Sequence, residues 1–98
     1  MVLGNGNGNE IEPPIETEHV LYEIARERRR QDHMYGEQNH DPLFWLAILG
    51  EEFGETCRAV YEAIHNGQPW DHYRREIIEV AAVAAVMAEC WDRNKEKV

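Results

Sequence analysis

Five glutamates in the second half of the chain have the spacing that a metal site needs. Residues 51–55 read EEFGE and residues 76–79 read EIIE. In a helix, residues three and four apart share one face, so each segment places its carboxylates on one side. Carboxylates that converge without a local Lys repel one another, and hard oxygen ligands of this kind suit Mg²⁺ or Mn²⁺. The candidate ligands are Glu51, Glu52, Glu55, Glu76 and Glu79.

Glu79 has the most unusual surroundings of the five. It is the only polar residue among the Ile, Val, Ala and Met of residues 77–88. An ionised carboxylate removed from water costs several kcal/mol unless it is paired, hydrogen-bonded or bound to a metal. The alternative is a solvated acidic face, because Glu is a good helix former. Glu52 and Glu55 continue the apolar face begun by Trp45, which favours the metal site, since a solvated stripe should not coincide with a core stripe.

Three helices are expected to position these side chains, over residues 17–35, 42–65 and 70–93. Asp41 is a good N-cap for the second helix, and a Pro follows it at the first helical position. Asn66-Gly67 supplies the stop. No segment alternates as a half-buried strand does, so the predicted fold class is all-α.

The third predicted helix indicates that a single chain is not the complete unit. Around residues 77–88 it is apolar on nearly all sides and rich in Ala. A helix that is apolar all round must be enclosed, and a short chain with three helices cannot easily enclose it. We therefore expect a three-helix bundle completed by oligomerisation, as a homodimer or, with two dimers joined, a homotetramer.

Composition narrows the function classes. The chain has 98 residues, with 19 Asp and Glu against 10 Lys and Arg. This acidity argues against a nucleic acid polymer as partner, and it allows small anionic substrates only where a metal screens the carboxylates. Residues 1–15, with their Asn-Gly repeat, are expected to be a disordered tail, and residues 16–98 one domain.

The location expected for this chain is the cytoplasm. No basic region followed by an apolar run marks a signal peptide, and the longest apolar run is too short to span a membrane. Cys57 and Cys90 lie far apart among apolar residues, so both are expected to be buried, reduced thiols.

The order of the glutamates resembles a known family. E-E-x-x-E, followed about twenty residues later by E-x-x-[D/E], is similar to the MazG-like all-α nucleoside triphosphate pyrophosphohydrolases, over roughly residues 28–93. The segment NHDPLFW is also similar to relatives that carry a His two residues before a Pro, as His40 stands to Pro42. At the position of Glu79 the family usually has Asp, whose side chain is one methylene shorter than that of Glu.

The resemblance implies an activity and roles for individual residues. Mg²⁺, or Mn²⁺, would act with water on the α–β phosphoanhydride of an NTP or dNTP, giving the monophosphate and pyrophosphate. Glu51 would be a further ligand or a base that orients water. The metal ligands implied are Glu52, Glu55, Glu76 and Glu79.

Other residues have two interpretations each. Asn39, His40 and Trp45 could bind a base by hydrogen bonding and stacking. In the alternative interpretation, Trp45 is packed in the core and His40 lies in a loop. The run Arg28–Arg30 is expected to be a solvated face, with phosphate binding as the alternative.

Two further alternatives concern function. E-x-x-H at residues 62–65 is the spacing of a di-iron bundle, but such a site needs a second pair, and the one at residues 37–40 falls in a loop. A non-catalytic helical oligomer that retains the fold for assembly or nucleotide sensing is the alternative to an enzyme.

Overall fold

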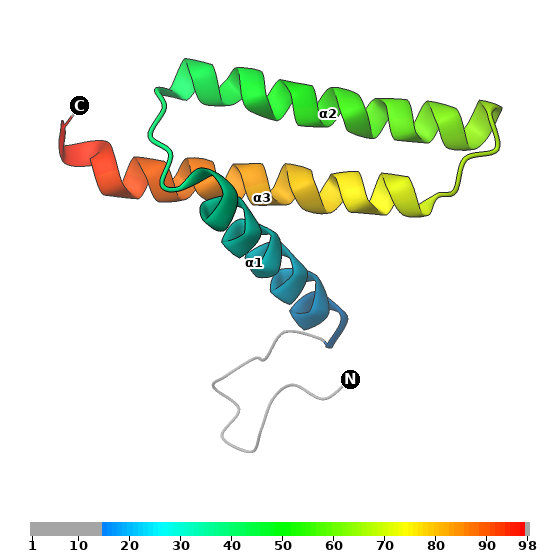
Figure 1. The fold of residues 1–98 in the computed structure, drawn as a ribbon, viewed down its shortest axis with the longest axis horizontal. Helices are drawn as coiled ribbons and strands as arrows, with labels where there is room; N and C mark the ends of the chain where they lie inside the picture. The colour runs from blue at the N-terminus through cyan, green and yellow to red at the C-terminus, as the bar shows by residue number, and fades with distance from the viewer. Residues whose placement is uncertain (1–14, 98) are drawn as a thin grey trace, which may run out of the picture.

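The computed structural model describes residues 15–97, and all regular structure in this range is helical (Figure 1). Three long helices, α1 (Ile15–Tyr35), α2 (Pro42–His65) and α3 (Asp71–Asn94), precede a short 3₁₀ helix, η1 (Lys95–Lys97). α2 and α3 lie side by side and antiparallel, while α1 crosses α3 at an angle. α3 is the central helix, because both other long helices pack against it. The all-α prediction is confirmed.

Local signals place the ends of α2 where the sequence predicts them. The Asp41 carboxylate accepts a hydrogen bond from the backbone N–H of Phe44 at 2.9 Å, which caps the helix. At the other end the backbone N–H of Asn66 donates to the Glu62 carbonyl. Gly67 then adopts a φ of +70°, a left-handed conformation that favours glycine.

The predicted bounds of the other two helices differ slightly from the structure. α1 begins at Ile15, two residues before the expected Thr17, so Ile15 is helical rather than part of the tail. The rest of the predicted tail lies outside the described residues. α3 begins at Asp71 and ends at Asn94, one residue later at each end than expected.

The buried core of the chain is small. Trp45 of α2 is 4% exposed and packs against Val86 and Cys90 of α3. The burial of Cys90 confirms one of the two predictions for the thiols. The buried apolar residues of the described chain are Trp45, Ala59, Ala82, Val83, Val86 and Cys90.

One side of the α2–α3 pair is an exposed apolar face. A groove of about 520 Å³ runs along it, and Ala84 is exposed one helical turn beyond Val80. Cys57 is exposed here, so its predicted burial is wrong for the single chain. None of the helices in the described part has both the length and the apolar character to cross a membrane. The groove is lined by Phe53, Thr56, Cys57, Val60, Tyr73, Ile77 and Val80.

An ion pair between a buried guanidinium and a half-exposed carboxylate holds α1 on another side of α3. The Arg28 guanidinium, 8% exposed, donates to both carboxylate oxygens of Glu89, at 2.6 and 3.2 Å. It also donates to Asp32 at 2.8 Å within α1. The expectation of a solvated face is therefore wrong for Arg28, because its partner lies 61 residues later in the chain, while Arg29 and Arg30 are exposed as expected.

Candidate metal centre

Three of the five glutamates singled out by the sequence converge between α2 and α3. Glu52 faces Glu76 and Glu79, and one carboxylate oxygen from each lies within 4.8 Å of the other two. The antiparallel pairing of the two helices produces this arrangement, since residues near the middle of α2 lie opposite residues near the start of α3. We call Glu52, Glu76 and Glu79 the carboxylate trio.

The trio contains buried oxygens without partners. Oε2 of Glu52 and Oε1 of Glu76 are inaccessible to solvent and accept no hydrogen bond in the described structure. Buried polar atoms are normally satisfied, and an unsatisfied one costs free energy. A divalent cation would satisfy both oxygens, so the donor set fits Mg²⁺ or Mn²⁺.

The pKa values of Glu52 and Glu79 reflect the same crowding of carboxylates. Burial and, after it, the charges of the acidic neighbours, Glu79 first, together raise the pKa of Glu52 to about 7. Burial followed by the charge of Glu76 also raises the pKa of Glu79, while Arg30 acts in the opposite direction. Without a cation, the site therefore tends to hold protons.

Glu51 and Glu55 lie outside the trio. Both side chains are exposed, but their charges contribute to the raised pKa of Glu52, so they lie near it. Glu55 also lines a cavity together with Glu76. Glu55 thus does not continue the buried face of Trp45, and its role as a ligand stays a prediction.

A cavity of about 200 Å³ adjoins the trio. Polar side chains of α1 line it opposite Glu52 and Glu79, and the sequence had given no reason to expect Gln31 or Tyr35 there. The buried indole nitrogen of Trp45, in the same lining, has no hydrogen-bond partner in the described structure. The lining residues are Arg30, Gln31, Tyr35, Gln38, Trp45, Ile48, Glu52, Glu79, Val83 and Val86.

Arg30 is the cationic group of this cavity. Its guanidinium donates to the Glu27 carboxylate at 2.6 and 2.9 Å, and this pairing raises the pKa of Arg30. Arg30 also lies close enough to Glu79 for its charge to lower the pKa of that carboxyl, although Glu27 balances the charge of Arg30.

Asn39, His40 and Trp45 come together at the start of α2, as the base-binding prediction requires. The His40 ring stacks on Phe44 with ring centres 4.5 Å apart, and it meets Trp45 edge-on at 4.7 Å. The side-chain oxygen of Asn39 accepts hydrogen bonds from Arg93 and Asn94. Both the packed interpretation and the binding interpretation of these residues therefore retain support.

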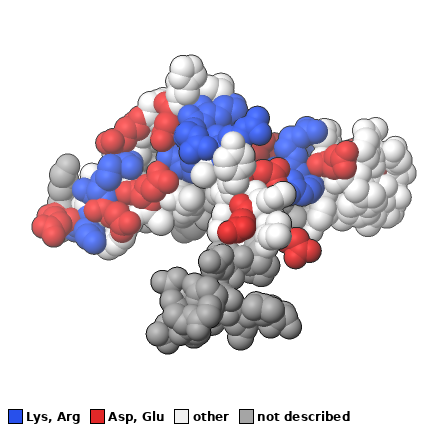
Figure 2. All heavy atoms as spheres, turned by 90° about the horizontal axis from the view of Figure 1, so that it is seen from below, with Lys and Arg blue, Asp and Glu red and all other residues white. Residues whose placement is uncertain are grey.

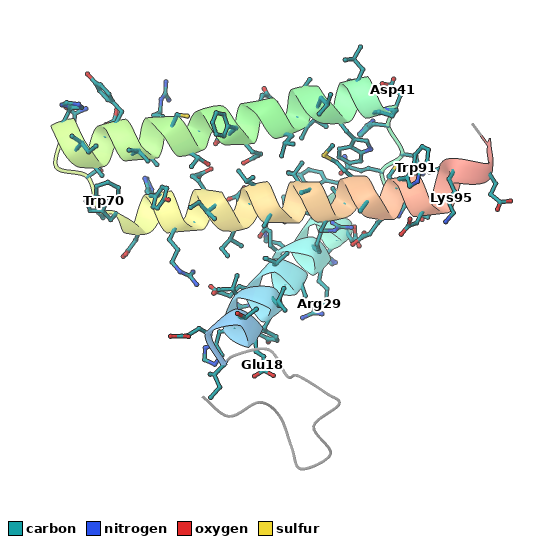
Figure 3. The ribbon with its side chains drawn as sticks, turned by 180° about the vertical axis from the view of Figure 1, so that it is seen from behind. Glu18, Arg29, Asp41, Trp70, Trp91 and Lys95 are labelled. Carbon is teal, nitrogen blue, oxygen red and sulfur yellow. The ribbon has the colours of Figure 1, made fainter. Side chains whose placement is uncertain are left out.

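A second cavity, of about 670 Å³, lies beside these residues. Asp41 and Trp91, which both line it, lie at the same end of the α2–α3 pair, and Trp70 lies at the other end (Figure 3). The walls of this cavity combine large apolar groups with a few polar ones, as small-molecule sites do. The lining residues are Asn39, His40, Asp41, Pro42, Trp45, Met87, Ala88, Cys90, Trp91 and Asn94.

The di-iron alternative finds no support in the described part of the chain. The trio is the one group of side chains there with metal-ligand geometry, and it contains no His. Glu62 and His65 are not part of it.

No protein-family model, curated protein or solved structure matches the chain. Function is therefore inferred from the arrangement of the side chains themselves.

Proposed function

We propose that the chain is a MazG-like, Mg²⁺-dependent hydrolase that cleaves an NTP or dNTP to the monophosphate and pyrophosphate, with Mn²⁺ as a possible substitute. The observation that carries the proposal is the convergence of Glu52, Glu76 and Glu79, with two buried carboxylate oxygens that lack partners. Without a cation, a cluster of this kind destabilises the folded chain; with one, the same carboxylates serve as ligands.

The trio would hold the cation, and Glu55 would complete its coordination after a change of rotamer. When bound, the cation would neutralise phosphate charge and lower the pKa of a water molecule. Glu51 is exposed beside the trio and would accept a proton from the attacking water. The water oxygen bonds to the α-phosphorus, the α–β P–O bond breaks, pyrophosphate leaves, and the proton on Glu51 passes to solvent.

The larger cavity would take the nucleoside. Trp45 and Glu52 are seven residues apart on α2, which at 1.5 Å per residue is a rise of about 10 Å. A base held beside Trp45 and His40 would thus place its phosphates toward the trio. Asn39 would contact the base edge through hydrogen bonds.

We also propose that the active unit is a homodimer or homotetramer. Many large apolar side chains are exposed in the single chain, among them Leu43 at 77% and Phe53 at 63%, and no large side chain within residues 15–97 is fully buried. Extensive exposure of large apolar side chains is typical of an interface between chains. The exposed apolar face of α2 and α3 is the surface that a second copy would cover.

Pyrophosphate release from a panel of NTPs and dNTPs tests the activity. We expect at least one nucleotide to be cleaved with Mg²⁺ or Mn²⁺, and none with EDTA. Release of orthophosphate instead of pyrophosphate, or no turnover of any nucleotide with either metal, would overturn the proposal.

A non-catalytic helical oligomer that binds nucleotide is the second candidate. The extensive apolar face favours it, because assembly alone accounts for that surface. It predicts that a nucleotide binds, as measured by calorimetry, while no pyrophosphate appears.

A further inference from the structure

A groove lined with arginines runs between α1 and the first half of α3. Its volume is about 660 Å³, and four guanidinium groups line it. Figure 2 shows Lys and Arg side chains gathered over the middle of the molecule, with acidic side chains around them. The four are Arg26 and Arg30 from α1, with Arg74 and Arg75 from α3.

Arginines are concentrated in this groove, although three carboxylates, Glu23, Glu27 and Asp71, line it as well. The whole sequence has only 10 Lys and Arg and a formal net charge of −9, so the groove holds four of the ten. Two of the four are neutralised, because Arg30 pairs with Glu27 and Arg74 pairs with Glu23, each at 2.6 Å.

The other two guanidinium groups are available to a ligand. Arg26 and Arg75 are exposed, and neither forms an ion pair or side-chain hydrogen bond with any residue of the described range. They approach the groove from different helices. A planar guanidinium binds phosphate oxygens through two parallel hydrogen bonds, so two of them could hold two phosphate groups.

The groove adjoins the candidate metal centre. Arg30 lines both this groove and the 200 Å³ cavity whose walls include Glu52 and Glu79. Ile78, which also lines the groove, is the neighbour of Glu79 in the chain. An anion in the groove would therefore lie beside whatever occupies the trio.

We infer that this groove binds the terminal two phosphates of the nucleotide, the part that leaves as pyrophosphate, with Arg26 and Arg75 as the principal donors. The inference rests on the proposed function, because it takes the α-phosphate to lie at the trio. Nucleoside triphosphates would accordingly be preferred over diphosphates and monophosphates, and inorganic pyrophosphate would bind to the same groove.

Binding of inorganic pyrophosphate in the presence of Mg²⁺, measured by calorimetry on the full chain, tests the inference. Arg26→Gln and Arg75→Gln should each raise the Kd about tenfold, which is the loss expected for one charge-assisted contact. Arg29→Gln is the matched control: it removes the same charge from α1, but Arg29 does not line the groove. It should change the Kd less than twofold, so that loss of net charge alone is separated from loss of a contact.

The outcomes separate this inference from the proposed function. Equal affinity of the wild-type chain and both groove variants for pyrophosphate would overturn the inference, even if the enzyme turns over NTPs. Weakened binding in the groove variants alone would support the groove, even if no nucleotide is cleaved. A rise in melting temperature with Mg²⁺ that is the same in all variants would show that folding and the trio are intact. With inorganic triphosphate in place of an NTP, the same ranking of variants would show that the phosphates alone are recognised.

Discussion

Glu52 and Glu79 are carboxylates for which a proton and a cation compete. Burial removes water from both; Glu52 lies in the field of Glu79, and Glu79 lies in the field of Glu76. A proton relieves the repulsion at acidic pH, while a divalent cation can relieve it at neutral pH without protonation. Without metal, the folded chain should therefore be less stable at neutral pH, at which the enzyme would work, than at acidic pH.

The first prediction is a fall in metal-free stability as the pH rises. The pKa of Glu52 is raised from its ordinary value of 4.5 to about 7, so the folded chain binds the proton more tightly than the unfolded chain between these values. Its stabilising contribution is full below about 4.5 and is lost as the pH rises to about 7. Thermal unfolding in EDTA across this range should record the decline.

Two variants check the origin of this decline. Glu52→Gln should flatten the dependence on pH, whereas Glu18→Gln, on the exposed start of α1, should not. Glu23 and Glu27 have lowered pKa values because Arg74 and Arg30 donate hydrogen bonds to them, so their contributions are lost only at more acidic pH. Glu79, whose pKa is also raised, should leave a smaller slope of the same sign, so a slope in Glu52→Gln as steep as in the wild type would contradict this origin.

The second prediction is that Glu79→Gln separates stability from activity. The neutral amide fills the same volume and removes repulsion, so the metal-free melting temperature at neutral pH should stay the same or rise. An amide binds a hard cation poorly, so Mg²⁺-dependent pyrophosphate release should fall to background. Full turnover by Glu79→Gln would remove this residue from the site.

At the scale of elements, the position of α1 decides what faces the trio. α1 contributes Arg30 to both the trio cavity and the arginine groove. It is held on α3 by the bidentate contact of Arg28 with Glu89 and by the contact of Glu23 with Arg74. The first of these contacts is the more buried, so it should contribute more to stability.

The third prediction is that Arg28→Ala loosens α1. The loss of a largely buried guanidinium and its contacts with Glu89 and Asp32 should lower the free energy of unfolding by about 1–3 kcal/mol. Arg29→Ala, an exposed neighbour without such contacts, should change it by less than about 0.5 kcal/mol. Chemical denaturation measures both. Equal effects of the two substitutions would show that the ion pair is not what holds α1.

The helices were predictable because their signals are local. Asp41 before a Pro and Asn66 before a Gly determine both ends of α2 within a few residues of sequence. The pairing of Arg28 with Glu89 joins residues 61 apart, and nothing in the run of arginines identifies which one is buried. Helical periodicity alone could not resolve this.

The candidate site was predictable in part for the same reason. The E-x-x-E spacing places Glu76 and Glu79 on one face, and the short link between α2 and α3 brings Glu52 opposite them. Spacing could not decide that Glu55 points to solvent, because a small rotation of α2 moves it into or out of the interface. The arginine groove depends on the crossing of α1 and α3, which leaves no local signal.

At the scale of the whole molecule, a single chain leaves many large apolar side chains in water, and this exposure supports the proposed oligomer. The exposed apolar face continues along both α2 and α3, on a side that α1 does not cover. Cys57 lies exposed on the same surface and would become buried if a second chain packed there.

The fourth prediction is that Ala84→Glu disrupts assembly. Ala84 is exposed on α3 beside the apolar groove, so a Glu there would place an unpaired charge in a close contact between helices. Light scattering should give two or four times the chain mass for the wild type and a lower mass for the variant. Ala25→Glu, at an exposed position of α1, should leave the mass unchanged. A stable, folded wild-type monomer at micromolar concentration would contradict the account of assembly.

The most direct test of the metal centre is thermal unfolding of the wild-type chain and of Glu76→Gln, each in EDTA and in Mg²⁺. A cation that binds only the folded chain stabilises it by about 1.4 kcal/mol at ten times its Kd, which for a domain of this size raises the melting temperature by roughly 5–10 °C. The account predicts a rise of this order for the wild type and a much smaller one for Glu76→Gln. Equal melting temperatures of the wild type in EDTA and in millimolar Mg²⁺ would contradict it and return the trio to an ordinary acidic cluster.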